Sequence, residues 1–246
     1  MENRQVLVIG ESCLDIFVYG EAHRLAPDLP IPILTDCVEV RNPGMAANVT
    51  KNLEALGLEV DLVTNSNWRD VTKTRFVHSS SNHTFLRVDR QDKILPLRRI
   101  PNLDKYGTVI ISDYDKGFLP EPLVEDIIDA HRNVIIDTKK ILGPWVSNAR
   151  LIKINAYEFS KSHGFIDESI ESKIIKTRGE FGAEYQEVAY EVQKVDARDT
   201  SGAGDAFLAS LVHGLTLGGD VPSAIRLANF RASETVKNRG VTIVAP

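Results

Sequence analysis

Short apolar runs alternate along the chain with segments in which apolar residues recur at helical spacing. The runs 6–10, 60–64, 108–112, 134–137 and 151–155, and a shorter one at 174–177, have the length and composition of buried strands in a parallel sheet. Helical spacing predicts helices at about 46–56, 121–131, 204–217 and 221–237. This alternation predicts an α/β fold in which right-handed βαβ units build a central, mostly parallel sheet with helices on both faces.

Two parts of the chain depart from this alternation. Residues 16–19 read as a strand, and the three prolines of 26–33 exclude a central strand or a helix interior and favour an extended edge segment. Residues 73–77 and 84–88 predict two antiparallel strands joined by a polar turn at 78–83. We therefore expect a small β sheet, formed by about 16–40 and 72–97, inserted into a single domain that spans 1–246.

Composition narrows the class of protein. The 246 residues include 29 basic and 34 acidic side chains, a net charge of −5, which argues against a nucleic-acid partner. No apolar run reaches the roughly 18 residues of a membrane span, and the N-terminus leads directly into a strand-like run rather than a signal peptide. The two cysteines, Cys13 and Cys37, lack metal-ligand spacing, so we expect a reduced, cytoplasmic setting and no membrane partner.

The run Asp-Thr-Ser-Gly-Ala-Gly-Asp at 199–205 stands directly before a predicted helix. Free N–H groups at a helix start, together with the helix dipole, favour an anion, and Gly202 and Gly204 would let a phosphate approach the backbone. Asp205 beside such a site would suit a base that takes a proton from an attacking nucleophile. The alternative is an ordinary capped helix start with an acid in its first turn.

The same run resembles the C-terminal signature of the ribokinase (PfkB) family of carbohydrate kinases. The resemblance implies a ribokinase-like three-layer fold, a β-sheet lid over a sugar site, and a kinase that uses ATP and a small-molecule sugar substrate. In that family the Gly-Ala-Gly amides, here Gly202, Ala203 and Gly204, form an anion hole for the transferring phosphoryl group. The final aspartate, here Asp205, is the catalytic base acting on a sugar hydroxyl.

Polar residues that follow predicted strands are candidates for the sugar site, because ligands of open α/β sheets bind at the carboxyl ends of strands. Asp15 could accept hydrogen bonds from two vicinal hydroxyls, Gly44 could let a sugar reach the backbone, and Asn48 could both donate and accept. A turn aspartate, a loop glycine and a helix asparagine are the plain alternatives. The family carries a second glycine where this chain has Met45, which adds a side chain at that point.

Further matches concern the nucleotide and a metal ion. The Asn-x-x-Glu spacing at 155–158 follows a predicted strand, and in the family it helps to hold Mg²⁺ and its waters near the phosphates; Glu158 alone is chemically sufficient because Mg²⁺ keeps several waters. Residues 177–182 resemble the Thr-x-Gly-x-x-Gly loop that lies along ATP in the family. The two glycines of this segment could equally form a hairpin turn. The residues that the resemblance assigns to the nucleotide are Asn155, Thr177, Gly179, Gly182 and Asn229. For Asn229 a capping or solvated asparagine is the plain alternative.

The first half of the chain looks like one subgroup, the D-glycero-D-manno-heptose 7-phosphate kinases of lipopolysaccharide precursor synthesis. The segments that carry this likeness are 24–32, 43–49, 73–76, 86–90 and 112–117. The likeness implies phosphorylation of a heptose 7-phosphate at its anomeric hydroxyl. Lys116, Arg75 and Arg87 are available to bind a substrate phosphate, with a solvated surface charge as the alternative for each.

Two features support a rival interpretation. Only residues 65–70 separate the strand at 60 from the lid strand at 73, where relatives carry a helix and a strand, and Met45 replaces a glycine. A catalytically impaired sugar- or nucleotide-binding protein on the same fold is therefore one alternative, and a kinase for another sugar or a nucleoside is a second. Missing elements would also expose sheet edges, which a homodimer through the β lid could cover.

Overall fold

A large central sheet organises the molecule, whose computed structural model describes residues 5–91 and 93–245. Within these residues the sheet has eight strands in the order β12-β11-β10-β9-β8-β7-β1-β4. Its strands are β1 (Val6–Gly10), β4 (Val60–Val63), β7 (Thr108–Asp113), β8 (Val134–Thr138), β9 (Leu151–Asn155), β10 (Ile174–Thr177), β11 (Ala183–Tyr185) and β12 (Val188–Tyr190). Pairing is parallel from β4 to β10 and antiparallel from β10 to β12.

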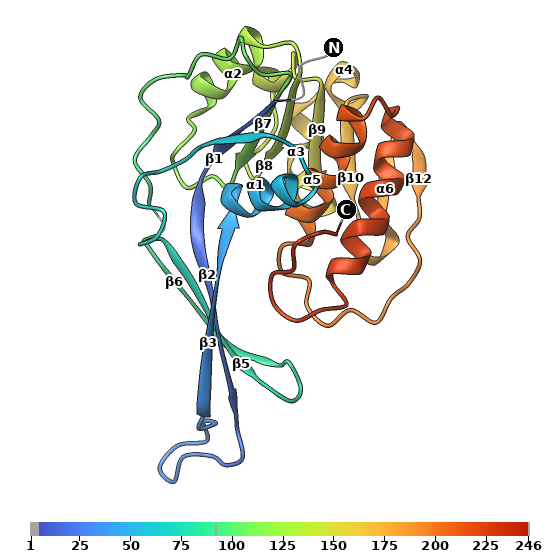
Figure 1. Cartoon of the computed structure of the whole chain (residues 1–246). Helices are drawn as coiled ribbons and strands as arrows, with labels where there is room; N and C mark the ends of the chain where they lie inside the picture. Colours follow the sequence, from blue (N-terminus) through green and yellow to red (C-terminus); the bar gives the residue numbers. More distant parts are fainter. Residues whose placement is uncertain (1–4, 92, 246) are drawn as a thin grey trace.

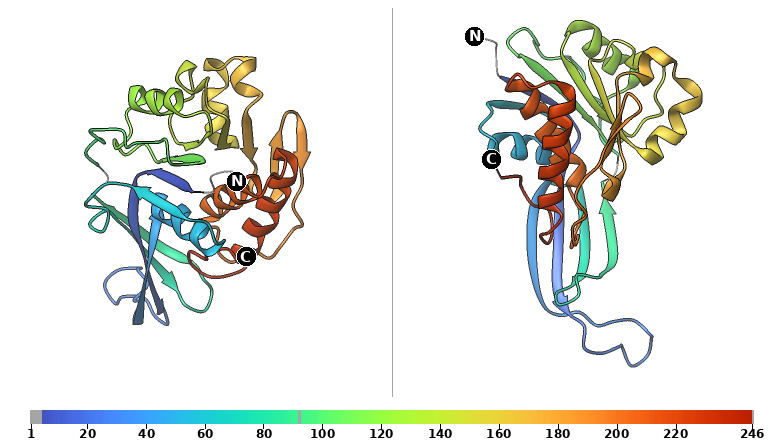
Figure 2. Two further views of the ribbon diagram at one scale, coloured as in Figure 1. Left: turned by 45° about the horizontal axis from the view of Figure 1, so that its top comes forward. Right: turned by 90° about the vertical axis from the view of Figure 1, so that its right-hand side faces the viewer.

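Helices cover both faces of this sheet (Figures 1 and 2). One face carries α1 (Ala46–Ala55), α5 (Ala203–Thr216) and α6 (Val221–Thr235); the other carries α2 (Glu121–Ala130), α3 (Ala156–Ser162) and α4 (Glu168–Glu171). Alternate side chains of β1 divide between two cores, with Leu7 and Ile9 on the α2 side and Val6 and Val8 on the α1 side. Strands buried on both faces explain the continuous apolar runs, and the three-layer α/β prediction is confirmed.

A second sheet projects away from this body (Figures 1 and 2). In the described chain it has four strands in the order β3-β2-β5-β6, namely β2 (Ser12–Glu21), β3 (Thr35–Met45), β5 (Thr72–His78) and β6 (Thr84–Arg90). Strands β5 and β6 pair antiparallel, as the alternating pattern predicted, and β2 runs parallel to β5. We call this sheet the lid; the division of the chain into domains stays a prediction.

Several elements escaped prediction. Strand β3 was missed because its place is set by pairing with β2 rather than by burial of its outer half, and because it contains Pro43. Asp15 lies within strand β2 and Gly44 within strand β3, so the plain alternatives of a turn aspartate and a loop glycine do not describe them. Residues 64–71 connect β4 to β5 by turns alone, which leaves β4 at the sheet edge. No helix within 5–91 or 93–245 is long and apolar enough to cross a membrane.

Candidate functional site

Helix α5 begins after a glycine and has no side-chain cap. Gly202 precedes it with φ of 80°, a left-handed conformation that favours glycine. The Ala203 N–H donates to the Thr200 carbonyl at 3.2 Å. No acceptor from the described residues reaches the N–H groups of Gly204 and Asp205. The helix therefore presents free backbone donors at its start, although one of the three expected amides is already used.

Asp205 is buried just inside this helix start, with 5% of its surface exposed. Its Oδ2 accepts a hydrogen bond from Asn48 Nδ2 at 2.8 Å, and its Oδ1 accepts one from the Tyr114 hydroxyl at 2.7 Å. Burial raises the pKa of the Asp205 carboxyl, while the hydrogen bonds from Asn48 and Tyr114 act to lower it. The carboxylate is thus held in one orientation by α1 and by the segment after β7, far away in sequence.

The expected sugar ligands lie on the lid side of this carboxylate. Asp15 Oδ1 accepts a hydrogen bond from Arg75 Nη1 at 2.7 Å, between the paired strands β2 and β5. A Cβ added at Gly44 would lie 2.1 Å from Asp15 Oδ2, so only glycine fits there. Burial, the Asp15 charge and a smaller effect of Asp205 raise the pKa of the Cys13 thiol to about 12, which puts both carboxylates close to this thiol.

Met45 takes the conformation that a glycine would favour. Its φ is 60° and its ψ is −133°, at the residue before α1. The side chain is buried and belongs to the core cluster that includes Cys13 and Val71. The side chain that replaces the family's glycine therefore packs into the core, at the cost of backbone strain.

Lysine side chains beside the helix start were not anticipated from sequence. Lys153, 3% exposed, donates to Asp137 Oδ2 at 2.6 Å, and a Cβ at Gly204 would lie 3.1 Å from its Nζ. Burial acts to lower the pKa of Lys139, but the charges of Asp137 and Glu158 outweigh it and raise the pKa. The one available signal was a lysine inside the otherwise apolar run 151–155. These lysines bring positive charge to the place where a phosphoryl group would be transferred.

Glu158 is engaged by protein groups on both oxygens. Its Oε1 lies 2.5 Å from Lys139 Nζ, and its Oε2 accepts the Asn155 N–H at 2.8 Å, while Asn155 Oδ1 caps the Glu158 N–H at 2.9 Å. Asp137 Oδ1 is buried and accepts no hydrogen bond from the described residues, although Lys139 Nζ lies 3.9 Å away. Those residues contain no cluster of three or more His, Cys, Asp or Glu side chains that could hold a metal ion. The donors fit only a Mg²⁺ ion that is carried mainly by phosphates and waters.

A cleft of about 240 Å³ lies beside Gly204 and is lined mainly by apolar groups. It brings together four of the residues predicted to bind the nucleotide, Thr177, Gly179, Gly182 and Asn229. Asn155 is not part of its lining but pairs with Thr177 across β9 and β10.

The plain alternatives for this loop are also present. Gly179 and Gly182 have positive φ and lie in the hairpin between β10 and β11. Asn229 Nδ2 donates to the Tyr190 carbonyl at 2.7 Å, and a Cβ at Gly182 would lie 2.1 Å from that same oxygen. These residues therefore shape the wall of the cleft as well as line it.

The three expected substrate cations come from different elements: Arg75 lies on β5, Arg87 on β6, and Lys116 in the segment that follows β7. The pKa of Asp89 is lowered by a hydrogen bond from Arg87 and, less strongly, by the charge of Lys116. The Lys116 N–H donates to Glu11 Oε1 at 3.0 Å. Arg75 pairs with a predicted sugar ligand, Asp15, at 2.7 Å.

Comparisons with known proteins show what the chain is similar to. Residues 144–246 match the family described as pfkB family carbohydrate kinase. This segment is therefore similar to pfkB family carbohydrate kinases. The bifunctional protein HldE of Caulobacter vibrioides is 28% identical over 300 residues, covering 98% of this chain, and that of Coxiella burnetii is 29% identical over 296 residues, covering 99%. The chain spans 62% of the length of each of these relatives.

Solved structures identify the fold of the whole chain. A nucleoside kinase of Methanocaldococcus jannaschii, described as an archaeal member of the ribokinase family, superposes with a TM-score of 0.72 at 14% identity, covering 98% of this chain and 95% of that one. Arabidopsis thaliana ribokinase complexed with ribose and ATP gives 0.70 at 15% identity, with 96% and 93% covered. The expected likeness to the ribokinase/PfkB carbohydrate kinases is thereby confirmed.

Proposed function

We propose that this chain transfers a phosphoryl group from ATP to a hydroxyl of a sugar. The observation that carries the proposal is the buried Asp205 carboxylate, fixed by Asn48 and Tyr114 at the free amide start of α5. Asp205 takes the proton of the attacking hydroxyl, and its raised pKa makes it a stronger base than an exposed aspartate. The backbone at Gly202–Gly204 and the Lys153 ammonium offset the charge of the transferred group, so that positioning and electrostatics supply the catalysis.

ATP occupies the cleft beside Gly204 in this proposal. The apolar walls of that cleft suit a base, and the glycine-rich hairpin at 178–182 borders it. Glu158 and Asp137 would hold Mg²⁺ through its waters. The Glu158 carboxylate would then bind both these waters and the Lys139 ammonium. When bound, Mg²⁺ neutralises phosphate charge.

The substrate that we propose is a heptose 7-phosphate, phosphorylated at the anomeric hydroxyl, with Asp15, Gly44 and Asn48 at the sugar. Two observations support it. The relatives named HldE match nearly the whole of this chain. A cavity of about 310 Å³ between the lid and the 197–201 segment contains two arginines, Arg75 and Arg198, which suit a substrate phosphate.

We also propose a homodimer that forms through the lid in a cytoplasmic protein. Strand β3 exposes Val38 and Val40, 62% and 42% accessible, on one face of the lid. Exposed apolar residues on a projecting sheet indicate a partner surface. Light scattering of wild type and of Val38→Glu checks this, since the charged variant should be monomeric at equal concentration.

The deciding experiment measures ADP release with a panel of acceptors: heptose 7-phosphate, unphosphorylated heptose, ribose, fructose 6-phosphate and a nucleoside. The proposal expects heptose 7-phosphate to give the highest kcat/KM and Arg198→Gln to raise KM for phosphorylated acceptors only. Preference for another acceptor would leave the kinase but replace the substrate. Binding of ATP and sugar without turnover above the Asp205→Asn control would favour the catalytically impaired protein.

A further inference from the structure

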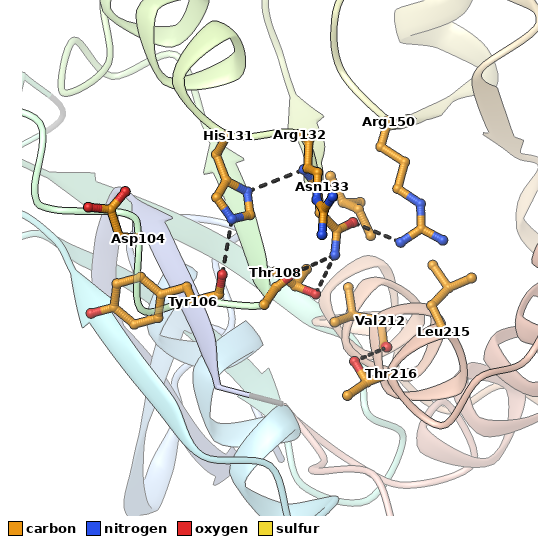
Figure 3. A pocket seen from close by; sticks show the side chains of 12 residues that line it. Asp104, Tyr106, Thr108, His131, Arg132, Asn133, Arg150, Val212, Leu215 and Thr216 are labelled. Carbon is orange, nitrogen blue, oxygen red and sulfur yellow. Dashed lines mark hydrogen bonds between the residues drawn. The ribbon is translucent and has the colours of Figure 1, made fainter. Parts of the chain in front are cut away.

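A second cavity, of about 650 Å³, lies at the end of the main sheet away from Asp205 (Figure 3). Its lining includes Thr108 at the first residue of β7 and Val212, Leu215 and Thr216 in the last turns of α5. Since a helix rises about 1.5 Å per residue, Thr216 lies about 16 Å from Asp205 along α5. This cavity is therefore separate from the proposed catalytic site, and nothing in the proposed reaction uses it.

Two arginines give the cavity its charge. Arg150 Nη1 donates to Asn133 Oδ1 at 2.8 Å, and Asn133 Nδ2 in turn donates to the Gly107 carbonyl at 2.6 Å and to Thr108 Oγ1 at 2.9 Å. This chain of hydrogen bonds holds one edge of the Arg150 guanidinium and leaves its remaining N–H groups available. Arg132 also lines the cavity and has no carboxylate partner among the described residues (Figure 3).

The other titratable side chains of the cavity do not cancel this charge. His131 Nδ1 accepts the Asn133 N–H at 3.3 Å and its Nε2 lies 3.0 Å from the Tyr106 carbonyl, so backbone groups engage both ring nitrogens. Asp104 lies beyond His131 from the two arginines in Figure 3. The cavity thus concentrates two positive charges in a protein whose net charge is −5.

Apolar groups form another wall of the cavity. Ile135, Val212 and Leu215 line it, on the side of β8 and α5. A volume of about 650 Å³ lies within the range of small-molecule sites, which combine apolar walls with a few convergent polar groups. Two guanidinium groups from separate segments suit a dianion with several acceptor oxygens better than they suit a single carboxylate.

We propose that this cavity binds a small phosphate monoester. The phosphate lies between Arg132 and Arg150, and an apolar or ring-shaped body rests against Val212 and Leu215. Nucleoside monophosphates and sugar phosphates both combine a phosphate with a ring, and titration with one compound of each class separates them.

Methyl NMR of the full chain tests the proposal, because different valines and leucines report the two sites. Methyl groups of Val212 and Leu215 report this cavity, while Val192 and Val195 line the cleft beside Gly204. The titrants are AMP, ribose 5-phosphate and, as a carboxylate of similar size, benzoate. We expect saturable shifts at Val212 and Leu215 with at least one phosphate monoester, and weaker binding of benzoate; the tighter phosphate titrant identifies the source.

Matched variants make the test specific. Arg132→Gln and Arg150→Gln, both at exposed side chains, should each weaken binding at Val212 and Leu215 about tenfold or more, because each removes a charge-assisted contact. Arg98→Gln, an exposed arginine outside the cavity, should leave it unchanged. The proposal is overturned by unchanged affinity in both variants, by tighter binding of benzoate, or by shifts confined to Val192 and Val195 up to about 10 mM ligand.

Discussion

Replacing Asp205 by asparagine removes the charge of the proposed base and keeps its shape. In the folded protein the carboxylate is 5% exposed and its pKa is raised, chiefly by burial. Because its pKa is higher in the folded protein than in the unfolded chain, the protonated form of Asp205 favours folding. This contribution to stability is complete below the unfolded pKa and is lost as the pH rises through the folded pKa. Above its folded pKa the ionised Asp205 therefore costs stability, and a neutral amide avoids that cost.

The amide cannot accept both hydrogen bonds that the carboxylate accepts. One of the donors, Asn48 Nδ2 or the Tyr114 hydroxyl, then faces an NH₂ group, and the hydroxyl can rotate to accept instead. The lost bond is worth about 1 kcal/mol, which opposes the relief from burying a charge. We therefore expect Asp205→Asn to unfold at nearly the wild-type temperature or above it, as measured by calorimetry.

The rate should respond very differently from the stability. Loss of a general base costs about 10²- to 10⁴-fold in kcat, or roughly 3–5 kcal/mol of barrier. ADP release at saturating ATP and acceptor measures this, and calorimetric titration checks that ATP still binds. A kcat within tenfold of wild type would refute the role of Asp205. So would a variant that loses both ATP binding and thermal stability, because the acid would then be structural.

Three further predictions concern Tyr114, Gly44 and Met45. Tyr114→Phe removes a hydrogen bond that favours the ionised form of Asp205, so the pKa of Asp205 should rise and the acid limb of the kcat/KM profile should move to higher pH; an unmoved limb would contradict it. Gly44→Ala places a Cβ 2.1 Å from Asp15 Oδ2, so KM for the sugar should rise about tenfold in steady-state assays while KM for ATP stays the same. Met45→Gly should be more stable than Met45→Ala by about 1–2 kcal/mol in urea unfolding, the reverse of the usual order, because φ is 60° there; greater stability of the alanine variant would sink this reasoning.

The fold could be predicted largely because its core is patterned locally. Strands such as β1 and β7 are buried on both faces and read as unbroken apolar runs, and helices such as α5 show their spacing directly. Strand β3 could not be found in this way, since its outer half is exposed and its place is set by pairing with β2. Short elements such as α4 and β12 likewise depend on packing more than on pattern.

The candidate site divides in the same manner. The glycines and the acid of 199–205 point to an anion-binding helix start, because φ at Gly202 and the free N–H groups follow from local backbone geometry. The place of Lys153 beside Gly204 and the bond from Tyr114 to Asp205 could not be assigned from sequence, because about 50 and 91 residues separate the members of these pairs in the chain. Such contacts depend on the strand order.

The sequence by itself determined the layered α/β architecture, the family and the backbone chemistry at the start of α5. Only the tertiary structure decided that Asn48 and Tyr114 hold Asp205, that Met45 turns its side chain into the core, and that Glu158 is shared with Lys139. Local sequence patterns determine which segments are buried and which backbone conformations the turns adopt. The pairing of charges and hydrogen-bonding groups across segments is fixed when the sheet assembles.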